Sequence, residues 1–340
     1  MFYSHKLFGQ EMALTLLQRA LTGEHVAHAY LFSGREGVGK KLLAQQFAQS
    51  LNCEKGVSFS ECSCESCRKI REDIHPDVKW IGLDEELRSI KIEDIRLLQS
   101  WVALRPFEGR KKVVIINGAE RLTIEAANAF LKTLEEPPGN THIVLLIEHV
   151  FRLPDTVLSR LVEIRLLPLP FERLCTILNS EFHITEGTRY LAYQAQGSIG
   201  LALHYKEEDF LTIRNTVIDS FLKQDLIEYF FSSMPTAVSE IDTFLYIIGS
   251  VVHDMLLIKT GVDHSLLIHQ DRTADVVSRA ELLTREQIVQ LITLFEDARQ
   301  SLKQNVNTKL LLLHLAAHGD LILKKINNQK QTANALRYAM

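Results

Sequence analysis

The residues best suited to chemistry form a glycine-rich stretch near the start of this 340-residue chain. The pattern G-x-x-x-x-G-K runs from Gly34 through Gly39 to Lys40, between an apolar run and a helical pattern. Glycines at this spacing let backbone N–H groups surround phosphate oxygens at a helix N-terminus, where the helix dipole favours negative charge. The sequence therefore predicts a phosphate-binding loop that includes Gly34, Gly37, Gly39, Lys40 and Lys41. The alternative is a glycine turn that holds no ligand.

Two positions that would handle Mg²⁺ and water in a nucleotide hydrolase carry unsuitable side chains. The residue after the loop lysine should be Ser or Thr, whereas Lys41 has no lone pair to offer and repels a cation. A buried strand is predicted over residues 111–117 and should end in Asp-Glu, but Asn117 and Gly118 stand there. We therefore expect that ATP is not hydrolysed, and whether the loop binds ATP stays open.

Four of the five cysteines lie close together, from Cys53 to Cys67. The thiolates of Cys53, Cys62, Cys64 and Cys67 can surround one tetrahedral Zn²⁺, and Cys64-x-x-Cys67 has the usual spacing for such a site. No open coordination position and no nearby group suited to activating water is evident, so the predicted zinc is structural. The alternative is a set of free surface thiols.

Composition limits the kind of protein. The net charge of −4 gives no overall basic field, which disfavours free-standing nucleic-acid binding. The N-terminus has no signal-peptide pattern, and no apolar run is expected to approach membrane-spanning length. Clustered cysteines of this kind suit a metal site in a reducing compartment. We therefore expect a cytoplasmic protein with no membrane partner.

Apolar runs alternate with helical patterns up to about residue 168, which predicts an α/β P-loop fold with a parallel sheet. The expected strands cover residues 25–32, 78–81, 111–117, 141–147 and 162–165. From about residue 208 the pattern is helical almost throughout and predicts a packed bundle. The chain is thus expected to comprise an α/β domain (1–168) with the cysteine insert at about 53–67, a small helical domain (169–207) and an all-helical domain (208–340).

The motifs occur in a distinctive order. The phosphate-binding loop is followed by the cysteine insert, by His75-Pro76-Asp77, by Ala-Asn-Ala-Phe-Leu-Lys-Thr-Leu-Glu-Glu-Pro-Pro at 127–138, and by Ser159-Arg160. Over residues 1 to about 205 this order resembles the AAA+ clamp-loader subunits of bacterial DNA polymerase III. Within that group Lys41, Asn117-Gly118 and Gly200 replace catalytic parts of the gamma/tau motor, so the chain resembles the non-hydrolysing delta-prime family.

The resemblance implies an AAA+ module, a helical lid and a C-terminal collar. It implies that the chain is a stator in a hetero-oligomeric ring with gamma/tau motor subunits and delta. This ring would load the sliding clamp onto primer–template DNA during replication. The chain would then be a component of the DNA polymerase III holoenzyme, a DNA-directed DNA polymerase (nucleotidyltransferase), without ATPase activity of its own. It also implies that Arg160 is an arginine finger, acting in the ATP site of the adjacent motor subunit.

Two other functions compete with this one. The chain could be an active gamma/tau-type ATPase, which an ATPase assay would detect. The cysteine loop could also be a zinc module that binds nucleic acid, but its cations are nearly balanced by acids and only Phe59 could stack on bases. The position of the chain in the ring, the stoichiometry and any direct DNA contacts are not determined by the sequence.

Overall fold

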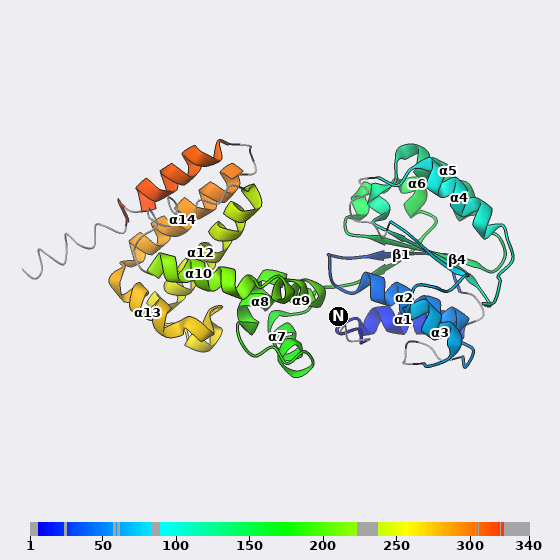
Figure 1. The fold of residues 1–340 in the computed structure, drawn as a ribbon, viewed down its shortest axis with the longest axis horizontal. Coiled ribbons are helices and arrows are strands. Elements are labelled where there is room, and N and C mark those ends of the chain that lie inside the picture. The colour runs from blue at the N-terminus through cyan, green and yellow to red at the C-terminus, as the bar shows by residue number, and fades with distance from the viewer. Residues whose placement is uncertain are drawn as a thin grey trace, which may run out of the picture. The chain divides into compact units, whose positions relative to one another are not determined.

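The structure is a computed structural model that describes residues 6–23, 26–56, 59, 62–82, 89–222, 237–302, 304, 306–319 and 321–322. The chain forms two compact units (Figure 1). Unit 1 comprises Met1–Leu174 and Ala195–Leu201, and unit 2 comprises Cys175–Gln194 and Ala202–Met340. The three-part division at residues 168 and 207 stays a prediction.

Unit 1 is built on a five-stranded sheet in the order β2-β3-β4-β1-β5, in which every neighbouring pair is parallel. The parallel sheet expected from the alternation of strands and helices is confirmed. Its strands are β1 (Ala29–Ser33), β2 (Val78–Ile81), β3 (Lys112–Asn117), β4 (Thr141–Ile147) and β5 (Val162–Arg165). Three of these match the predicted bounds. The first strand begins at Ala29 rather than at residue 25, which lies outside the described residues.

Helices cover both faces of this sheet, as a parallel sheet requires (Figure 1). Alternate residues of β3 and β4 belong to two separate cores, with Val113 and Val144 in one and Val114 and Ile143 in the other. The first core contains residues of α1 (Glu11–Thr22), α2 (Lys40–Asn52) and α3 (Glu65–Arg71), and the second those of α4 (Ile92–Val102), α5 (Ile124–Glu135) and α6 (Asp155–Leu158). Short 3-10 helices η1 (Ala119–Arg121) and η2 (Val150–Arg152) follow β3 and β4.

Unit 2 is helical, and a large cluster of buried aliphatic and aromatic side chains forms its core. The predicted helical bundle is therefore confirmed. The later helices are α7 (Phe171–Ser180), α8 (Thr188–Ala195), α9 (Ile199–Glu207), α10 (Phe210–Leu222), α12 (Val238–Lys259), α13 (Thr273–Leu282), α14 (Arg285–Leu302) and a helix over 308–319, with 3-10 turns η3 (His264–Leu266) and η4 (Gln270–Arg272).

One expectation about apolar runs is wrong. Within α12 the segment Glu240–Lys259 is long and apolar enough to cross a membrane by length and composition, with a mean hydropathy of 1.6. Among the described residues this is the one helix of that kind. Its side chains from Ile241 to Met255 contribute many of the buried members of the unit 2 core. The helix is apolar because it lies inside the bundle and packs against α10, α13 and α14.

Candidate functional site

The phosphate-binding loop lies where the sequence predicts it, between the end of β1 and the start of α2. Gly39 has φ +108°, a left-handed conformation that glycine adopts without strain, and α2 begins at the next residue, Lys40. No acidic side chain lies in the first turn of α2, so the positive end of its dipole faces the loop. The local geometry is that of an anion-binding loop, and the groups around it decide whether an anion can use it.

The ammonium group of Lys40 is engaged by the chain itself. Its Nζ donates hydrogen bonds to the carbonyl oxygens of Gly34 at 2.5 Å and Arg35 at 2.8 Å. Burial lowers the pKa of Lys40, and three carboxylates, led by Glu148 at 4.0 Å and followed by Glu120 and Glu36, act in the opposite direction. These carboxylates stabilise the lysine but repel a phosphate brought to the same place.

The first residues of α9 lie directly on the phosphate-binding loop. The N–H of Gly200 donates to the carbonyl oxygen of Gly37 at 3.0 Å. A Cβ added to Gly200 would lie 2.9 Å from both the Cα and the carbonyl oxygen of Gly37, which is closer than real Cβ atoms come. The arginine that the family resemblance places here in motor subunits could therefore not fit without moving the loop.

The end of β3 is occupied by an arginine that the sequence reasoning missed. Asn117 donates from Nδ2 to the carbonyl oxygen of Gly82 at 3.1 Å. The guanidinium of Arg121 donates to the same oxygen at 2.6 Å and to the carbonyl oxygen of Asn117 at 2.9 Å. A Cβ added to Gly118 would lie 2.6 Å from Nε of Arg121. A permanently charged guanidinium thus lies beside Asn117 and Gly118, the two residues that end β3 and follow it.

The four clustered cysteines come together as predicted. Cys53, Cys62, Cys64 and Cys67 are all buried, and their Sγ atoms all lie within 4.8 Å of one another. The Sγ atoms of Cys53 and Cys62 are 3.6 Å apart. Four sulfurs bound tetrahedrally to one zinc lie about 3.8 Å apart, because each Zn–S bond is about 2.3 Å long. The donor set and its spacing therefore fit a metal ion.

Helix ends position these sulfurs. Cys53 is the residue after the last turn of α2, and Cys64 is the N-cap of α3, where its Sγ accepts from the N–H of Cys67. Burial alone would raise the pKa of Cys64, but hydrogen bonds from the backbone of Cys67 and Glu54 lower it to about 7. Such a thiol readily loses its proton, and the resulting thiolate can bind a metal. The fifth cysteine, Cys175, belongs to unit 2 and not to the cluster.

Arg160 lies in the turn between α6 and β5. The turn precedes β5, whereas the phosphate-binding loop follows β1. Because these neighbouring strands are parallel, the turn and the loop lie at opposite ends of the strands. Its guanidinium donates to the carbonyl oxygen of Thr156 at 2.6 Å and to Oε1 of Glu135 at 2.5 Å. About a third of the side chain is exposed. Arg160 therefore cannot reach its own phosphate-binding loop but is accessible at the surface of unit 1.

Comparison with known proteins decides the family. A family model described as DNA polymerase III, delta subunit, matches residues 9–170, and one described as DNA polymerase III, delta subunit, C terminal, matches residues 208–318. DNA polymerase III subunit delta' of Bacillus subtilis is 30% identical over 318 residues, covering 90% of this chain and 94% of the relative. The chain belongs to the DNA polymerase III delta' family. The resemblance drawn from the motifs is thereby confirmed, and the chain is a clamp-loader subunit.

Two other relatives match only part of this chain. DNA polymerase III subunit tau of Escherichia coli is 39% identical over 207 residues, which are 59% of this chain but 32% of tau, so the chain spans about a third of that relative. Subunit delta' of Pseudomonas aeruginosa is 37% identical over 145 residues, covering 42% of this chain and 44% of the relative. A solved gamma subunit-related protein from Thermotoga maritima aligns with 18% identity and a TM-score of 0.45, covering 92% of this chain and 99% of the solved one.

Proposed function

We propose that this delta' family member is a non-hydrolysing stator of the clamp loader and supplies Arg160 to the ATP site of a neighbouring motor subunit. The ring would contain gamma/tau-type subunits and delta, and it would load the sliding clamp onto primer–template DNA in the cytoplasm. The AAA+ module (1–168), lid (169–207) and collar (208–340) are part of this proposal. So is the assignment of the chain to the DNA polymerase III holoenzyme without ATPase activity of its own.

One observation supports the proposal: residues of the chain itself contact the predicted phosphate-binding loop and the end of β3. The carbonyl oxygens of the loop bind Lys40, the backbone of Gly200 lies against Gly37, and the guanidinium of Arg121 lies at the end of β3. The missing hydroxyl at Lys41 removes a further ligand of Mg²⁺. A chain with this pocket contributes to ATP hydrolysis only by acting on another subunit.

Arg160 has the properties that such a contribution needs. It follows directly after the helical turn of α6 and precedes β5, so its backbone is fixed by two elements. A planar, permanently charged guanidinium stabilises the charge that spreads over phosphate oxygens during transfer. In the chain alone, the ion pair with Glu135 fixes the orientation of the Arg160 side chain. This ion pair must open or reorient when Arg160 reaches a phosphate in a neighbouring subunit.

The test is reconstitution of the loader with wild-type motor subunits, delta, clamp and primed DNA. Arg160→Ala should lower the rates of ATP hydrolysis and clamp loading while leaving ring assembly intact, and Arg160→Lys should not restore them, because Lys lacks the forked geometry. The loss should be partial, since other sites in the ring keep their own fingers. Arg152→Ala, at an exposed arginine eight positions earlier, is the control. Equal rates for Arg160→Ala and wild type would eliminate the trans-acting role.

We also propose that the ion held by the four cysteines is Zn²⁺ and that it is structural. The four thiols are buried and form a cluster separate from both cores of the sheet. Metal analysis should find one zinc per chain, which Cys64→Ser with Cys67→Ser should abolish and Cys175→Ser should not. Circular dichroism of the double variant should retain the signal of the sheet. A wild-type protein without zinc, or a double variant that keeps it, would contradict the assignment.

A hydrolysing gamma/tau-type subunit is the second candidate, and one observation favours it. The match to tau has a higher identity, 39%, than the match to B. subtilis delta', 30%, although it covers much less of either chain. The two functions differ in the ATPase activity of the purified chain alone. Turnover that disappears in Lys40→Ala would favour the motor, whereas no turnover above background is expected for the stator.

A further inference from the structure

The last described helix carries two histidines one turn apart. His314 and His318 lie at positions i and i+4 of the helix over 308–319, and both are exposed. Their ring centroids are 4.2 Å apart with an interplanar angle of 77°, so the edge of one ring meets the face of the other. The i, i+4 spacing places two imidazoles on one face of a helix, where both can bind the same ion.

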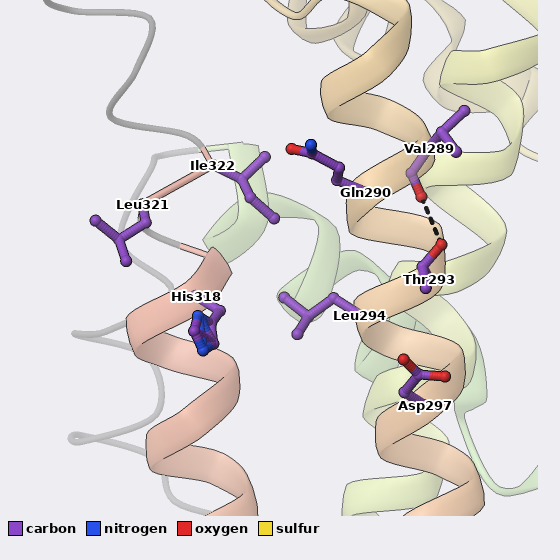
Figure 2. Close-up of a pocket in the computed structure, with 8 residues that line it drawn as sticks. All are labelled: Val289, Gln290, Thr293, Leu294, Asp297, His318, Leu321 and Ile322. Atoms are coloured by element: carbon purple, nitrogen blue, oxygen red, sulfur yellow. Dashed lines mark hydrogen bonds between the residues drawn. The ribbon is translucent and has the colours of Figure 1, made fainter.

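The surroundings leave this pair open. His318 lines a groove of about 430 Å³, and Asp297 and Thr293 of α14 line it as well (Figure 2). In the part of the chain that the structure describes, no hydrogen bond or ion pair of either histidine is found. The two ring centroids are 4.2 Å apart, so a turn of the side chains about their own torsions can direct one nitrogen of each ring to the same ion. Bonds from zinc to imidazole nitrogen are about 2.0–2.1 Å long.

Another exposed histidine in unit 2 shows what distinguishes the pair. His253 on α12 has a half-exposed side chain and lies 3.8 Å from the carboxylate of Asp254. The residues one turn away from it are Gly249 and Leu257, neither of which can bind a metal. His253 can therefore offer only one ligand, whereas His314 and His318 together form a chelate, which gains affinity because the second bond forms within the same site.

We propose that His314 and His318 form a surface site for a divalent transition metal of the Ni²⁺, Cu²⁺ or Zn²⁺ class. Imidazole nitrogen suits these ions, and water would complete the coordination. Among the described residues, only the four cysteines bring three or more ligand atoms within 4.8 Å of one another, so this second site has two protein ligands and is weaker. A bound ion cross-links one turn of the helix and thereby stabilises its last turns beside the groove.

The test uses the full chain, loaded with one equivalent of zinc so that the cysteine cluster is filled, and freed of excess metal. Ni²⁺ is the probe, and binding is followed by calorimetry and by the shift of the thermal midpoint. Wild type should bind one further Ni²⁺ saturably, with a rise in midpoint that EDTA reverses. His314→Gln and His318→Gln should each weaken this binding at least tenfold and abolish the rise.

His253→Gln is the matched control and should bind Ni²⁺ as wild type does. Because both histidines are exposed, the two variants should keep the metal-free midpoint of wild type, which separates loss of binding from loss of folding. No saturable Ni²⁺ binding by wild type would overturn the proposal. So would unchanged binding in both variants, or a loss in only one of them, because a chelate needs both rings.

Discussion

Asp77 is buried beneath a surface loop and fixes its conformation. Its Oδ1 accepts a hydrogen bond from the N–H of Phe107 at 2.7 Å, and its Oδ2 accepts from Glu108 at 2.9 Å and Gly109 at 2.7 Å. Burial opposes ionisation, but these three backbone donors, led by Gly109, hold the pKa of Asp77 below its ordinary value. The carboxylate thus stabilises the fold as an anion, and the His-Pro-Asp motif has a structural role in this loop.

Asp77→Asn should lower the free energy of unfolding by about 2–4 kcal/mol at neutral pH, because a neutral amide offers one acceptor oxygen to three donors. The pKa of Asp77 is lower in the folded than in the unfolded chain. Its stabilisation is therefore full above the unfolded value of about 3.9 and is lost as the pH falls through the folded one. Urea unfolding at successively lower pH, starting from pH 7, should show that the difference in the free energy of unfolding between Asp77→Asn and wild type becomes smaller.

Asp263→Asn serves as the control for this measurement. Asp263 is exposed, and its carboxylate accepts one backbone hydrogen bond, from Ser265. Asp263→Asn should therefore lower the free energy of unfolding much less than Asp77→Asn does. A difference between Asp77→Asn and wild type that stays constant in acid would show that the carboxylate does not act as an anion.

Two arginines buried in unit 2 have opposite surroundings. Arg214 is fully buried, and its Nη1 donates to Oδ1 of Asp271 at 3.0 Å. Arg279 is only 3% exposed, and in the described part of the chain none of its three guanidinium nitrogens has a hydrogen-bond partner. Burial lowers the pKa of Arg279, and the ring of Phe221 lies 5.9 Å away. Among the described residues, hydrogen bonds compensate the burial of Arg214 but not that of Arg279.

Arg279→Met should raise the free energy of unfolding by about 1–3 kcal/mol, because an apolar side chain of similar length removes the desolvation of an unpaired charge. Arg214→Met should lower it by about 3–5 kcal/mol, because Asp271 would lose the partner that compensates its charge. Urea unfolding at pH 7 measures both. If Arg279→Met were destabilising to the same degree as Arg214→Met, Arg279 would have a partner in solution.

At the scale of elements, the contact between the phosphate-binding loop and α9 decides what the loop can do. A P-loop is built to leave its backbone N–H groups free for phosphate. Here Ser198 caps α9 by accepting from the N–H of Leu201 at 3.2 Å, and Gly200 in the first turn packs on Gly37. The loop thus keeps the shape of an anion site while the first residues of α9, which belong to the same unit, lie against it.

Gly200→Ala tests this packing. The added Cβ would meet the Gly37 backbone at 2.9 Å, so the loop or α9 must move, and we expect a loss of about 1–3 kcal/mol in the free energy of unfolding. Amide hydrogen exchange in the loop should also become faster. Gly139→Ala, where nothing lies within 4 Å, should change stability by less than about 0.5 kcal/mol. Equal effects of the two substitutions would show that α9 does not press on the loop.

At the scale of the whole molecule, catalysis needs several parts at once, and this chain lacks them together. Lys41→Thr, Asn117→Asp and Gly118→Glu combined would restore the residue types of a hydrolase. We expect the triple variant to show no ATP turnover above background, because a Cβ at position 118 would lie 2.6 Å from Nε of Arg121 and Gly118 has φ +69°, which strains any other residue. Phosphate release measures this, with a motor subunit as positive control. Turnover that requires Lys40 would show that side chains alone had been missing.

The sequence by itself predicted the sheet and the residues of the candidate site. Strands such as residues 112–117 and 141–147 are buried on both faces, so their continuous apolar runs reveal them without knowledge of their neighbours. The glycine loop and the cysteine spacing are equally local, since each function depends on residues that follow one another closely. The replacement of the expected hydroxyl by Lys41 and of the expected carboxylate by Asn117 can be read in the same way.

Only the tertiary structure decided what surrounds these residues. The contact of Gly200 with Gly37 joins positions 163 residues apart, and nothing in the spacing of the sequence indicates a distance of 2.9 Å. Arg121 was missed because its role depends on the carbonyl oxygen of Gly82, which a different strand brings to it. The apolar length of α12 likewise has its explanation in the bundle that buries it. Local patterns specify elements, whereas packing between distant elements determines which groups meet and therefore what the site can do.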